Sequence, residues 1–431
     1  MRLFYTILIY FLSPFVLIRL FWLGLKNPAY WSRWKERFGF ISWKKTETPV
    51  IWVHAVSVGE VNAATPIVHR LLEHYSNHLI LITTVTPTGE QTVKYHFRDE
   101  VEHRYLPYDL PIAVNQFIKK IKPVLLIAME TEIWPNLYYL CNKNNLPILL
   151  VNARLSKKSA KRYRLVSKLM KETLSKVNLI AAQTSSDAER FISFGAIRDK
   201  VSVIGNLKFD ITIPQSITEQ AESIKRYFSV NRPIWMAAST QEGEDEQILE
   251  AHNQILKTYP SSILILAPRH PERVPNVASL CAAKGFNVIK RTEQMPFSED
   301  IQVYLLDTLG ELQAHYAASE LAFVGGSLVN TGGQNMLEPA SLGIPVLSGP
   351  NTYNFSEISE MLSKAGVLKL VYSSKDLATA VCHLFEDANL RHNIGEKGRN
   401  VIESNRGNIN HLMEMIEPYL SKDATYERKN I

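Results

Sequence analysis

Two stretches of the chain repeat one rhythm, in which short apolar runs alternate with longer amphipathic segments. The rhythm is typical of βαβ units on a parallel sheet, whose strands are buried on both faces and joined by crossover helices. In the first stretch the runs are 50–53, 79–83, 124–128, 148–151, 179–182 and 201–204. In the second they are 234–237, 263–266, 288–290, 303–306, 321–324 and 346–347. We therefore expect an α/β protein of two doubly wound, Rossmann-like domains facing each other, with six strands in each.

The length of 431 residues also favours two domains, because a single core rarely grows beyond about 250–300 residues. Residues 211–233 are polar and lack a strand signal, which indicates a linker with a short helix. We place the N-terminal domain at 26–210 and the C-terminal domain at 234–405. Helices are expected near 374–385 and 408–420, and residues 422–431 form a charged tail expected to be frayed.

The first 25 residues are apolar and aromatic, and we expect them to anchor the chain to a membrane. Their longest uncharged run, 3–18, is shorter than the roughly 20 residues of a simple span, and Pro14 and Arg19 interrupt the segment. A membrane span and a kinked anchor on one membrane face both remain open. A cleaved signal peptide is disfavoured, because no small-x-small site follows the apolar run.

Positive charge is concentrated beside this anchor. Residues 1–45 carry a net charge of +7, whereas the whole chain carries +6. This asymmetry favours an anionic phospholipid membrane over nucleic acid, whose binders more often spread basic residues over the folded body. The positive-inside rule then places the body on the cytoplasmic side. The basic residues expected to face lipid are Lys26, Arg33, Lys35, Arg37, Lys44 and Lys45.

The chain has three cysteines, Cys141, Cys281 and Cys382, which are far apart in sequence. Their odd number and their spacing favour a reducing compartment and exclude a structural zinc site of the usual pattern.

Ligands of doubly wound sheets bind beyond the carboxyl ends of the strands, so the strand-to-helix turns are candidate sites. Four such turns pair a capping residue with a glutamate three positions later. Each pair is equally typical of a capping box, in which the glutamate only stabilises the helix start. The pairs are Ser57 with Glu60, Ser239 with Glu242, Thr308 with Glu311, and Asn335 with Glu338. Because Gly59 leaves room beside Glu60, that carboxylate is a candidate general base.

A glycine-rich loop, 323–340, joins an apolar run to a helix start in the second domain. Its glycines let backbone N–H groups close on an anion, and a phosphate is the expected ligand. Asn335 is expected to cap the helix, and Glu338 either completes the cap or binds a ribose diol. The alternative is a capped helix after a flexible loop, since the loop matches neither the dinucleotide fingerprint nor the P-loop.

Two further turns carry charged side chains. Residues 129–136 contain Glu130, Glu132 and Trp134, an acidic pair suited to a cationic transition state or a metal. The metal interpretation is the weaker one, because no third ligand such as a histidine lies nearby. In the second domain, residues 267–273 place Arg269, His270 and Arg273 at a strand end, where a guanidinium can bind phosphate.

Taken together, residues 54–60, 129–136, 205–210, 268–273 and 323–340 resemble the 3-deoxy-D-manno-octulosonic acid (Kdo) transferases of Gram-negative bacteria. The resemblance extends almost end to end. It implies a GT-B glycosyltransferase fold, a CMP-Kdo donor, and the lipid A precursor (lipid IVA) as acceptor. It also implies action at the cytoplasmic face of the inner membrane, and a last helix, 406–421, that crosses back to the first domain.

The resemblance further implies residue roles. Glu60 is the catalytic base, and Glu130 and Lys208 assist the transition state. The residues implied to bind CMP are Pro268, Arg269, Leu309, Gly310, Glu311, Asn335, Met336, Leu337 and Glu338. No metal and no cofactor besides the donor substrate is expected, because cationic side chains can stabilise the leaving phosphate. One base with direct attack predicts inversion at the sugar.

Three other functions were weighed against this one. A nucleotide-sugar epimerase of the same fold accounts for two α/β domains but not for the basic anchor. A non-enzymatic membrane protein that senses a nucleotide leaves the acidic turns of the first domain without a purpose. A nicotinamide dehydrogenase is disfavoured, because residues 50–60 lack the Gly-x-Gly-x-x-Gly turn.

Overall fold

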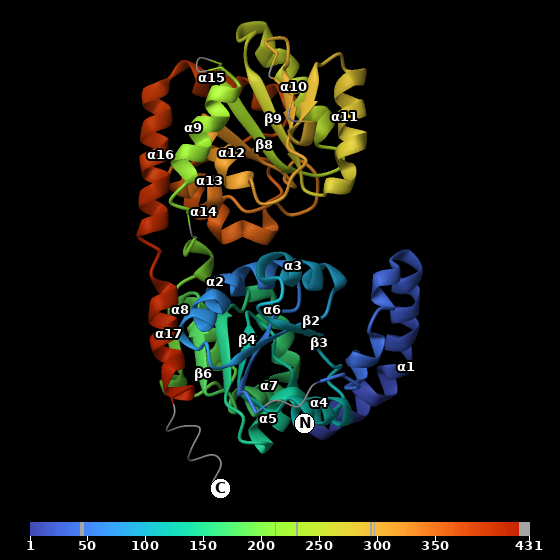
Figure 1. Ribbon diagram of the computed structural model, residues 1–431. Coiled ribbons are helices and arrows are strands. Elements are labelled where there is room, and N and C mark those ends of the chain that lie inside the picture. The colour runs from blue at the N-terminus through green and yellow to red at the C-terminus, as the bar shows by residue number, and fades with distance from the viewer. Residues whose placement is uncertain (44–46, 212, 230–231, 294, 297, 422–431) are drawn as a thin grey trace. The chain divides into compact units, whose positions relative to one another are not determined.

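The computed structural model describes the chain except for residues 44–46, 212, 230–231, 294, 297 and 422–431, and the side chain of Lys26 (Figure 1). The described chain divides into two compact units. Unit 1 is Met1–Asp210 together with the segment that begins at Arg406, and unit 2 is Ile211–Asn405. Each unit is built on one sheet of seven parallel strands with helices on its faces, so the protein is α/β with two doubly wound domains.

The sheet of unit 1 has the strand order β3-β2-β1-β4-β5-β6-β7. Its strands are β1 Val50–His54, β2 Leu79–Thr84, β3 Glu102–Tyr105, β4 Pro123–Met129, β5 Ile148–Ala153, β6 Leu179–Ala182 and β7 Val201–Val203. Alternate residues of each strand enter different cores: Trp52 packs on one face of the sheet and Ile51 on the other. The helices are α1 Arg2–Lys26, α2 Val58–His74, α3 Pro87–Phe97, α4 Pro111–Ile121, α5 Pro135–Lys143, α6 Lys157–Tyr163, α7 Ser167–Leu174, α8 Ser185–Ser193 and α17 Asn408–Ile416.

The sheet of unit 2 has the order β10-β11-β9-β8-β12-β13-β14. Its strands are β8 Ile234–Thr240, β9 Ile263–Pro268, β10 Val288–Lys290, β11 Val303–Leu305, β12 Leu321–Val324, β13 Val346–Ser348 and β14 Leu368–Leu370. The helices are α9 Ile217–Tyr227, α10 Asp245–Thr258, α11 Val274–Ala283, α12 Leu312–Ala318, α13 Leu337–Ser341, α14 Ser356–Lys364, α15 Ser374–Glu386 and α16 Ala388–Glu403.

Each sheet has one strand more than the sequence indicated. The additional strands, β3 and β14, lie at sheet edges. In β3 only His103 and Tyr105 are buried, and they alternate with Glu102 and Arg104. An edge strand is partly exposed to solvent, so it lacks the continuous apolar run that marks the central strands.

Two helices define the ends of unit 2. Helix α9 lies within the segment expected to be a linker, but it packs against α12, so most of that segment is a folded part of unit 2. After α16 the chain returns to unit 1, where α17 packs against α2. Ile409, Leu412 and Ile416 of α17 join the core beneath α2.

The basic flank of the anchor differs from the sequence expectation. The guanidinium of Arg33 forms an ion pair with Glu90 at 3.0 Å, and Arg37 is buried, donating to the backbone oxygen of Val85. These two arginines therefore stabilise unit 1 instead of facing lipid. Lys35 is exposed, whereas Lys44, Lys45 and the side chain of Lys26 lie outside the described part of the chain.

Candidate functional site

In unit 1 the candidate site lies where the strand order reverses. Strands β1 and β4 are neighbours that belong to the two halves of the sheet, and such a switch point opens a crevice at the strand ends. Glu60, in the first turn of α2, follows β1, and Glu130 follows β4. The topology thus brings two predicted site residues to adjacent strand ends.

The carboxylate of Glu60 is held inside the protein. Its Oε2 accepts a hydrogen bond of 2.8 Å from the backbone N–H of Val56. Burial above all, and the negative charges of Glu132 and Glu130, raise the pKa of Glu60 to about 9, although the hydrogen bond from Val56 and the charge of Lys208 act in the opposite direction. Glu60 is therefore a strong base once it is ionised.

Lys208 follows β7, which belongs to the half of the sheet that does not contain β1, and its side chain lies near Glu130. It lies in a short 3₁₀ turn, Leu207–Phe209, and its Nζ is 3.2 Å from Oε1 of Glu130. Asn206 and Asn152 fix the turn, because their side-chain oxygens accept the backbone N–H groups of Lys208 and Leu207. The predicted catalytic residues are therefore joined into one cluster of charges.

The backbone at this cluster adopts conformations that side chains normally avoid. Glu130 has φ of +50° and Asn152 has φ of +53°. Left-handed residues other than glycine cost free energy and concentrate at functional sites. Asn152 was missed from the sequence, although a polar residue in the otherwise apolar run 148–153 is a usable signal.

Glu132 extends the cluster into the interior. Its Oε2 accepts the indole N–H of Trp134 at 2.8 Å and lies 3.6 Å from Nε2 of His54. His54 is fully buried and its other ring nitrogen contacts Thr83. The sequence identified Glu132 and Trp134 as neighbours, but their partnership with His54 required the fold.

In unit 2, backbone amides of the glycine-rich loop bind a carboxylate of the protein itself. The carboxylate of Glu244, which is fully buried, accepts the backbone N–H groups of Gly326, Ser327 and Leu328 at 2.6–2.9 Å. The prediction that these amides bind a phosphate of the ligand is therefore wrong. Glu242, the acid singled out from the sequence in this turn, is exposed.

The two arginines of the basic turn after β9, Arg269 and Arg273, have different surroundings. Arg273 forms an ion pair with the buried Asp245 and donates to the backbone oxygen of Thr240. Its role is structural, which corrects its expected part in phosphate binding. His270 is exposed, 3.9 Å from Glu272.

Arg269 remains as the cation of this turn that is available to a ligand. It is half-buried directly after Pro268, and within the described chain its guanidinium makes no hydrogen bond. Its charge reaches Glu338, the pKa of which is raised by burial and lowered by Asn335 and Arg269.

Asn335 and Glu338 lie together at the start of α13. The Nδ2 of Asn335 donates to Oε1 of Glu338 at 2.9 Å, and its Oδ1 accepts the N–H of Leu337. The residue at the N-cap position is Met336, so Asn335 forms a turn one residue earlier than expected. Met336 and Leu337 are buried.

The turn before α12 contains Leu309, Gly310 and Glu311, which were predicted to bind CMP. Glu311 accepts two hydrogen bonds of 3.1 Å from Arg291 and a short one from Thr308. Although burial raises it, these bonds hold the pKa of Glu311 below its usual value. Gly310 has φ of +85°, and Leu309 before it is exposed.

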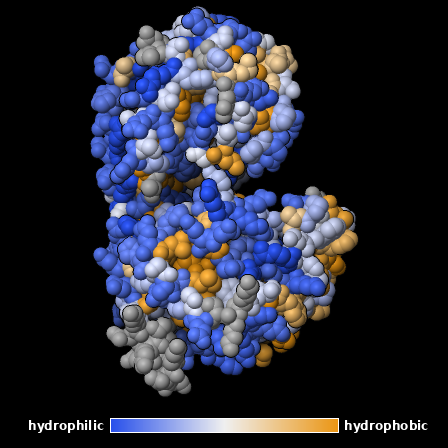
Figure 2. Space-filling view, viewed as in Figure 1, coloured by the Kyte–Doolittle hydropathy of each residue, from blue (hydrophilic) through white to orange (hydrophobic). Residues whose placement is uncertain are grey.

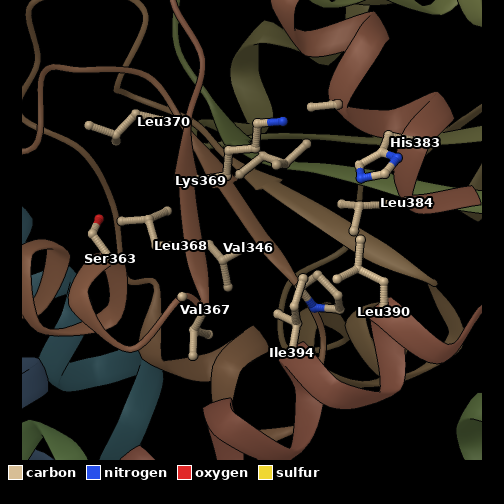
Figure 3. A pocket seen from close by; sticks show the side chains of 14 residues that line it. Val346, Ser363, Val367, Leu368, Lys369, Leu370, His383, Leu384, Leu390 and Ile394 are labelled. Atoms are coloured by element: carbon tan, nitrogen blue, oxygen red, sulfur yellow. The ribbon is translucent and has the colours of Figure 1, made fainter. Parts of the chain in front are cut away.

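The cavity drawn in Figure 3 lies away from these turns. It has a volume of about 510 Å³ and is lined mainly by aliphatic side chains of β13, β14, α15 and α16. The residues predicted to bind CMP do not line it. Across the described part of the chain, no three His, Cys, Asp or Glu side chains are grouped so that they could hold a metal ion.

Comparisons with known proteins agree with this arrangement. Residues 32–211 match the family model described as 3-deoxy-D-manno-octulosonic-acid transferase (kdotransferase), and residues 246–401 match glycosyl transferases group 1. The chain is 41% identical to a 3-deoxy-D-manno-octulosonic acid transferase of Haemophilus influenzae, over 98% of this chain and 100% of that protein. A second transferase of that name, from Bordetella pertussis, is 32% identical over 86% of this chain and 87% of its own length.

Among solved structures, UDP-GlcNAc 2-epimerase from Neisseria meningitidis resembles the chain with a TM-score of 0.57. The alignment covers 85% of this chain and 99% of that protein at 16% identity, so the likeness concerns the fold alone.

Proposed function

Since the chain belongs to the family of 3-deoxy-D-manno-octulosonic acid (Kdo) transferases, we propose a reaction for it in which Glu60 is the base. The chain is a glycosyltransferase that transfers Kdo in lipid A biosynthesis. The donor is CMP-Kdo and the acceptor is a hydroxyl group of the lipid A precursor. The single observation that carries the proposal is the half-buried Glu60 beside Glu130, Glu132 and Lys208 at the switch point of unit 1.

Glu60 removes the proton from the acceptor hydroxyl as its oxygen attacks the anomeric carbon of Kdo. This transfer passes through an oxocarbenium-like state, in which the bond to CMP breaks as positive charge grows on the sugar. The carboxylates of Glu130 and Glu132 favour that positive charge, and Lys208 favours the negative charge that develops on the leaving phosphate. Direct attack inverts the anomeric centre.

Unit 2 holds the nucleotide. Arg269 is half-buried, and its guanidinium makes no hydrogen bond to the residues that the structure describes, which suits a planar contact to the CMP phosphate. Glu338 and Glu311 lie in strand-end turns, where carboxylates can accept hydrogen bonds from ribose hydroxyls. Pro268, Leu309, Gly310 and the residues from Asn335 to Glu338 line these same turns. The chemistry uses no metal ion and no cofactor, because the guanidinium and ammonium groups supply the positive charge.

The reaction takes place at the cytoplasmic face of the inner membrane, where the lipid acceptor is embedded. The N-terminal apolar helix supports membrane association, because the segment Arg2–Leu25 is long and apolar enough to cross a membrane and little of it is buried in the protein. An epimerase function is not favoured, since the likeness to the epimerase is 16% in identity against 41% to the transferase.

The test is incubation of the purified protein with CMP-Kdo and lipid A precursor, followed by mass spectrometry of the lipid. A mass increase of one Kdo or more with release of CMP supports the proposal. An unchanged lipid, with the donor intact, contradicts it. The number of added sugars is read from the same spectrum.

A further inference from the structure

Helix α1 is fixed to unit 1 at its first turn. The hydroxyl of Tyr5 donates to Oδ2 of Asp109 at 3.0 Å, and the hydroxyl of Thr6 donates to Oδ1 of Asn136 at 2.8 Å. Both acceptors are buried, and Arg2 stacks over the ring of Tyr139 at 3.5 Å. Asp109 also accepts the backbone N–H groups of Asn136 and Leu137, whereas Oδ1 of Asn136 accepts hydrogen bonds from Arg2 and Thr6 of the first turn.

The last turn of α1 packs on the segment that leads into the same unit. A side chain at Gly24 would collide with Trp31, since its Cβ would lie 1.8 Å from the indole nitrogen. The chain then enters a 3₁₀ turn, Trp34–Phe38, where Glu36 accepts the backbone N–H of Tyr105 at 2.9 Å. The helix is thus attached to one folded body by its first turn and by the segment that follows its last turn.

These two attachments are incompatible with a helix that crosses the bilayer. With about 1.5 Å of rise per residue, the 25 residues of α1 extend roughly 37 Å, which is enough for the hydrocarbon core. A span would therefore place Tyr5 and Thr6 on the side of the membrane opposite to Asp109 and Asn136. Both contacts survive only if the helix stays on one side.

The exposed surface of α1 is largely apolar. Large apolar side chains are exposed around much of the helix, and Leu3 and Phe11 are 70% and 72% exposed. The remaining side, which includes Ser13 and Leu20, is partly or fully buried. Figure 2 shows hydrophobic surface over the part of unit 1 where α1 lies. The apolar side includes the most exposed of these side chains, Leu3, Phe4, Ile7, Phe11, Phe15, Ile18, Phe21, Trp22 and Leu25.

Charge and aromatic residues complement this apolar side. Arg19 is exposed in the second half of the helix, seven residues before its end, where a span would place its charge within the hydrocarbon. Lys35 is exposed on the flank, together with the half-exposed rings of Trp31 and Trp34. Cationic and indole groups of this kind interact with lipid headgroups, and the apolar side meets the acyl chains.

We propose that α1 lies in the plane of one leaflet of an anionic bilayer, with its apolar side among the acyl chains and both of its ends on unit 1. The inference does not depend on the reaction proposed above. The sequence leaves open a membrane span and an anchor on one membrane face, and the proposal selects the anchor on one face.

A cross-link in membranes tests the attachment of the first turn. In the Cys382→Ser background, in which the remaining cysteines are buried, Thr6→Cys is combined with Asn136→Cys. The replaced side chains touch, so a disulfide is expected on oxidation of the membrane fraction. The matched control pairs Ile7→Cys with Asn136→Cys and is expected to stay reduced, because Ile7 lies on the exposed side. A span keeps both pairs reduced, which would overturn the proposal.

A depth measurement decides the question even if Asn136→Cys does not fold. Single spin labels at Phe4, Phe11, Ile18 and Leu25 are placed in the same background in vesicles with anionic lipid. A helix in the plane gives similar, shallow depths at the four positions, from accessibility to oxygen and to a water-soluble nickel complex. A depth that peaks in the middle of the helix contradicts the proposal. Labels shielded from both reagents would place a protein, such as a second copy of the chain, on this face and would also contradict it.

Discussion

The ammonium group of Lys208 lies 3.2 Å from a carboxylate oxygen of Glu130, and both side chains act on the pKa of Glu60 in opposite directions. One lysine faces three carboxylates at this point, since Glu132 belongs to the same cluster. Negative charge therefore exceeds positive charge around the base. Burial, together with this excess of negative charge, raises the pKa of Glu60 and keeps the carboxyl group protonated at neutral pH.

Replacing Glu60 with Gln is expected to abolish turnover while CMP binding is retained. The amide has the shape of the carboxyl group but cannot accept the acceptor proton. Rates are compared by product formation and CMP affinity by calorimetry. Turnover near the wild-type rate would show that another group is the base.

The same variant is expected to be more stable than the wild type in alkali. Burial raises the folded-state pKa of Glu60 to about 9, from an ordinary value of 4.5. Wild-type stability is therefore complete below about pH 4.5 and is lost as the pH rises toward 9, by about 1.4 kcal/mol per pH unit. Denaturant unfolding at pH 5 and pH 8 measures the difference, which Glu60→Gln should lack. Parallel pH dependences of the two proteins would contradict the raised pKa.

The pH dependence of kcat/KM should move in opposite directions in two variants. Because Glu60 must be ionised, activity in the wild type is expected to rise with pH up to about 9. Glu132→Gln removes a negative neighbour and should shift this rise to lower pH. Lys208→Met removes the positive neighbour and should shift it to higher pH, with a lower plateau. Shifts in the same direction would refute the assignment of the cluster.

In the turn after β9, Arg269 is expected to bind the donor and Arg273 to stabilise the fold. Arg269→Ala is expected to weaken CMP binding at least about tenfold, with little change in melting temperature, because its guanidinium makes no hydrogen bond within the described part of the chain. Arg273→Ala serves as the contrast: it leaves the buried Asp245 unpaired and should lower the melting temperature. Equal CMP affinity of Arg269→Ala and the wild type would remove Arg269 from the donor site.

Glu244→Gln is expected to destabilise unit 2 by about 2–4 kcal/mol. The carboxylate accepts hydrogen bonds from Gln241 as well as from the glycine-rich loop, and a side-chain amide would direct N–H groups toward other N–H groups. Denaturant unfolding measures the loss. The exposed Glu242 provides a control, since Glu242→Gln should leave stability within about 0.5 kcal/mol of wild type. Similar stabilities of the two variants would contradict the role of Glu244.

Activity is expected to survive a chelator. Arg269 and Lys208 carry the positive charge that the leaving phosphate needs, so transfer should proceed at the same rate in excess EDTA. Loss of activity that magnesium restores would reveal a metal requirement.

Much of the fold followed from the sequence, because central strands of a parallel sheet are buried on both faces and leave continuous apolar runs. The edge strands β3 and β14 were missed for the complementary reason, since buried side chains in them are interrupted by partly or fully exposed ones. Six basic residues were likewise expected at lipid, whereas Arg33 and Arg37 are engaged by unit 1. Charge near an anchor does not reveal which side chains the folded body uses.

The candidate site could be located from the sequence but not completed. The turns after β1, β4 and β9 were identified because polar residues follow apolar runs. The partners that tune them come from distant segments: Asn152 supports the turn of Lys208 across 55 residues, and Glu244 reaches Gly326 across 82. Nothing in the local pattern distinguishes Glu244 from the exposed Glu242 two residues before it.

The Glu244 carboxylate has a consequence for inhibitor design. Glycine-rich loops invite compounds with a phosphate or carboxylate aimed at their amides, but here the amides from Gly326 to Leu328 are already saturated. A compound would first have to displace the Glu244 carboxylate, which is part of the same chain and therefore competes at high effective concentration. An inhibitor of the donor site is better served by an acidic group directed at Arg269, whose guanidinium makes no hydrogen bond within the described chain.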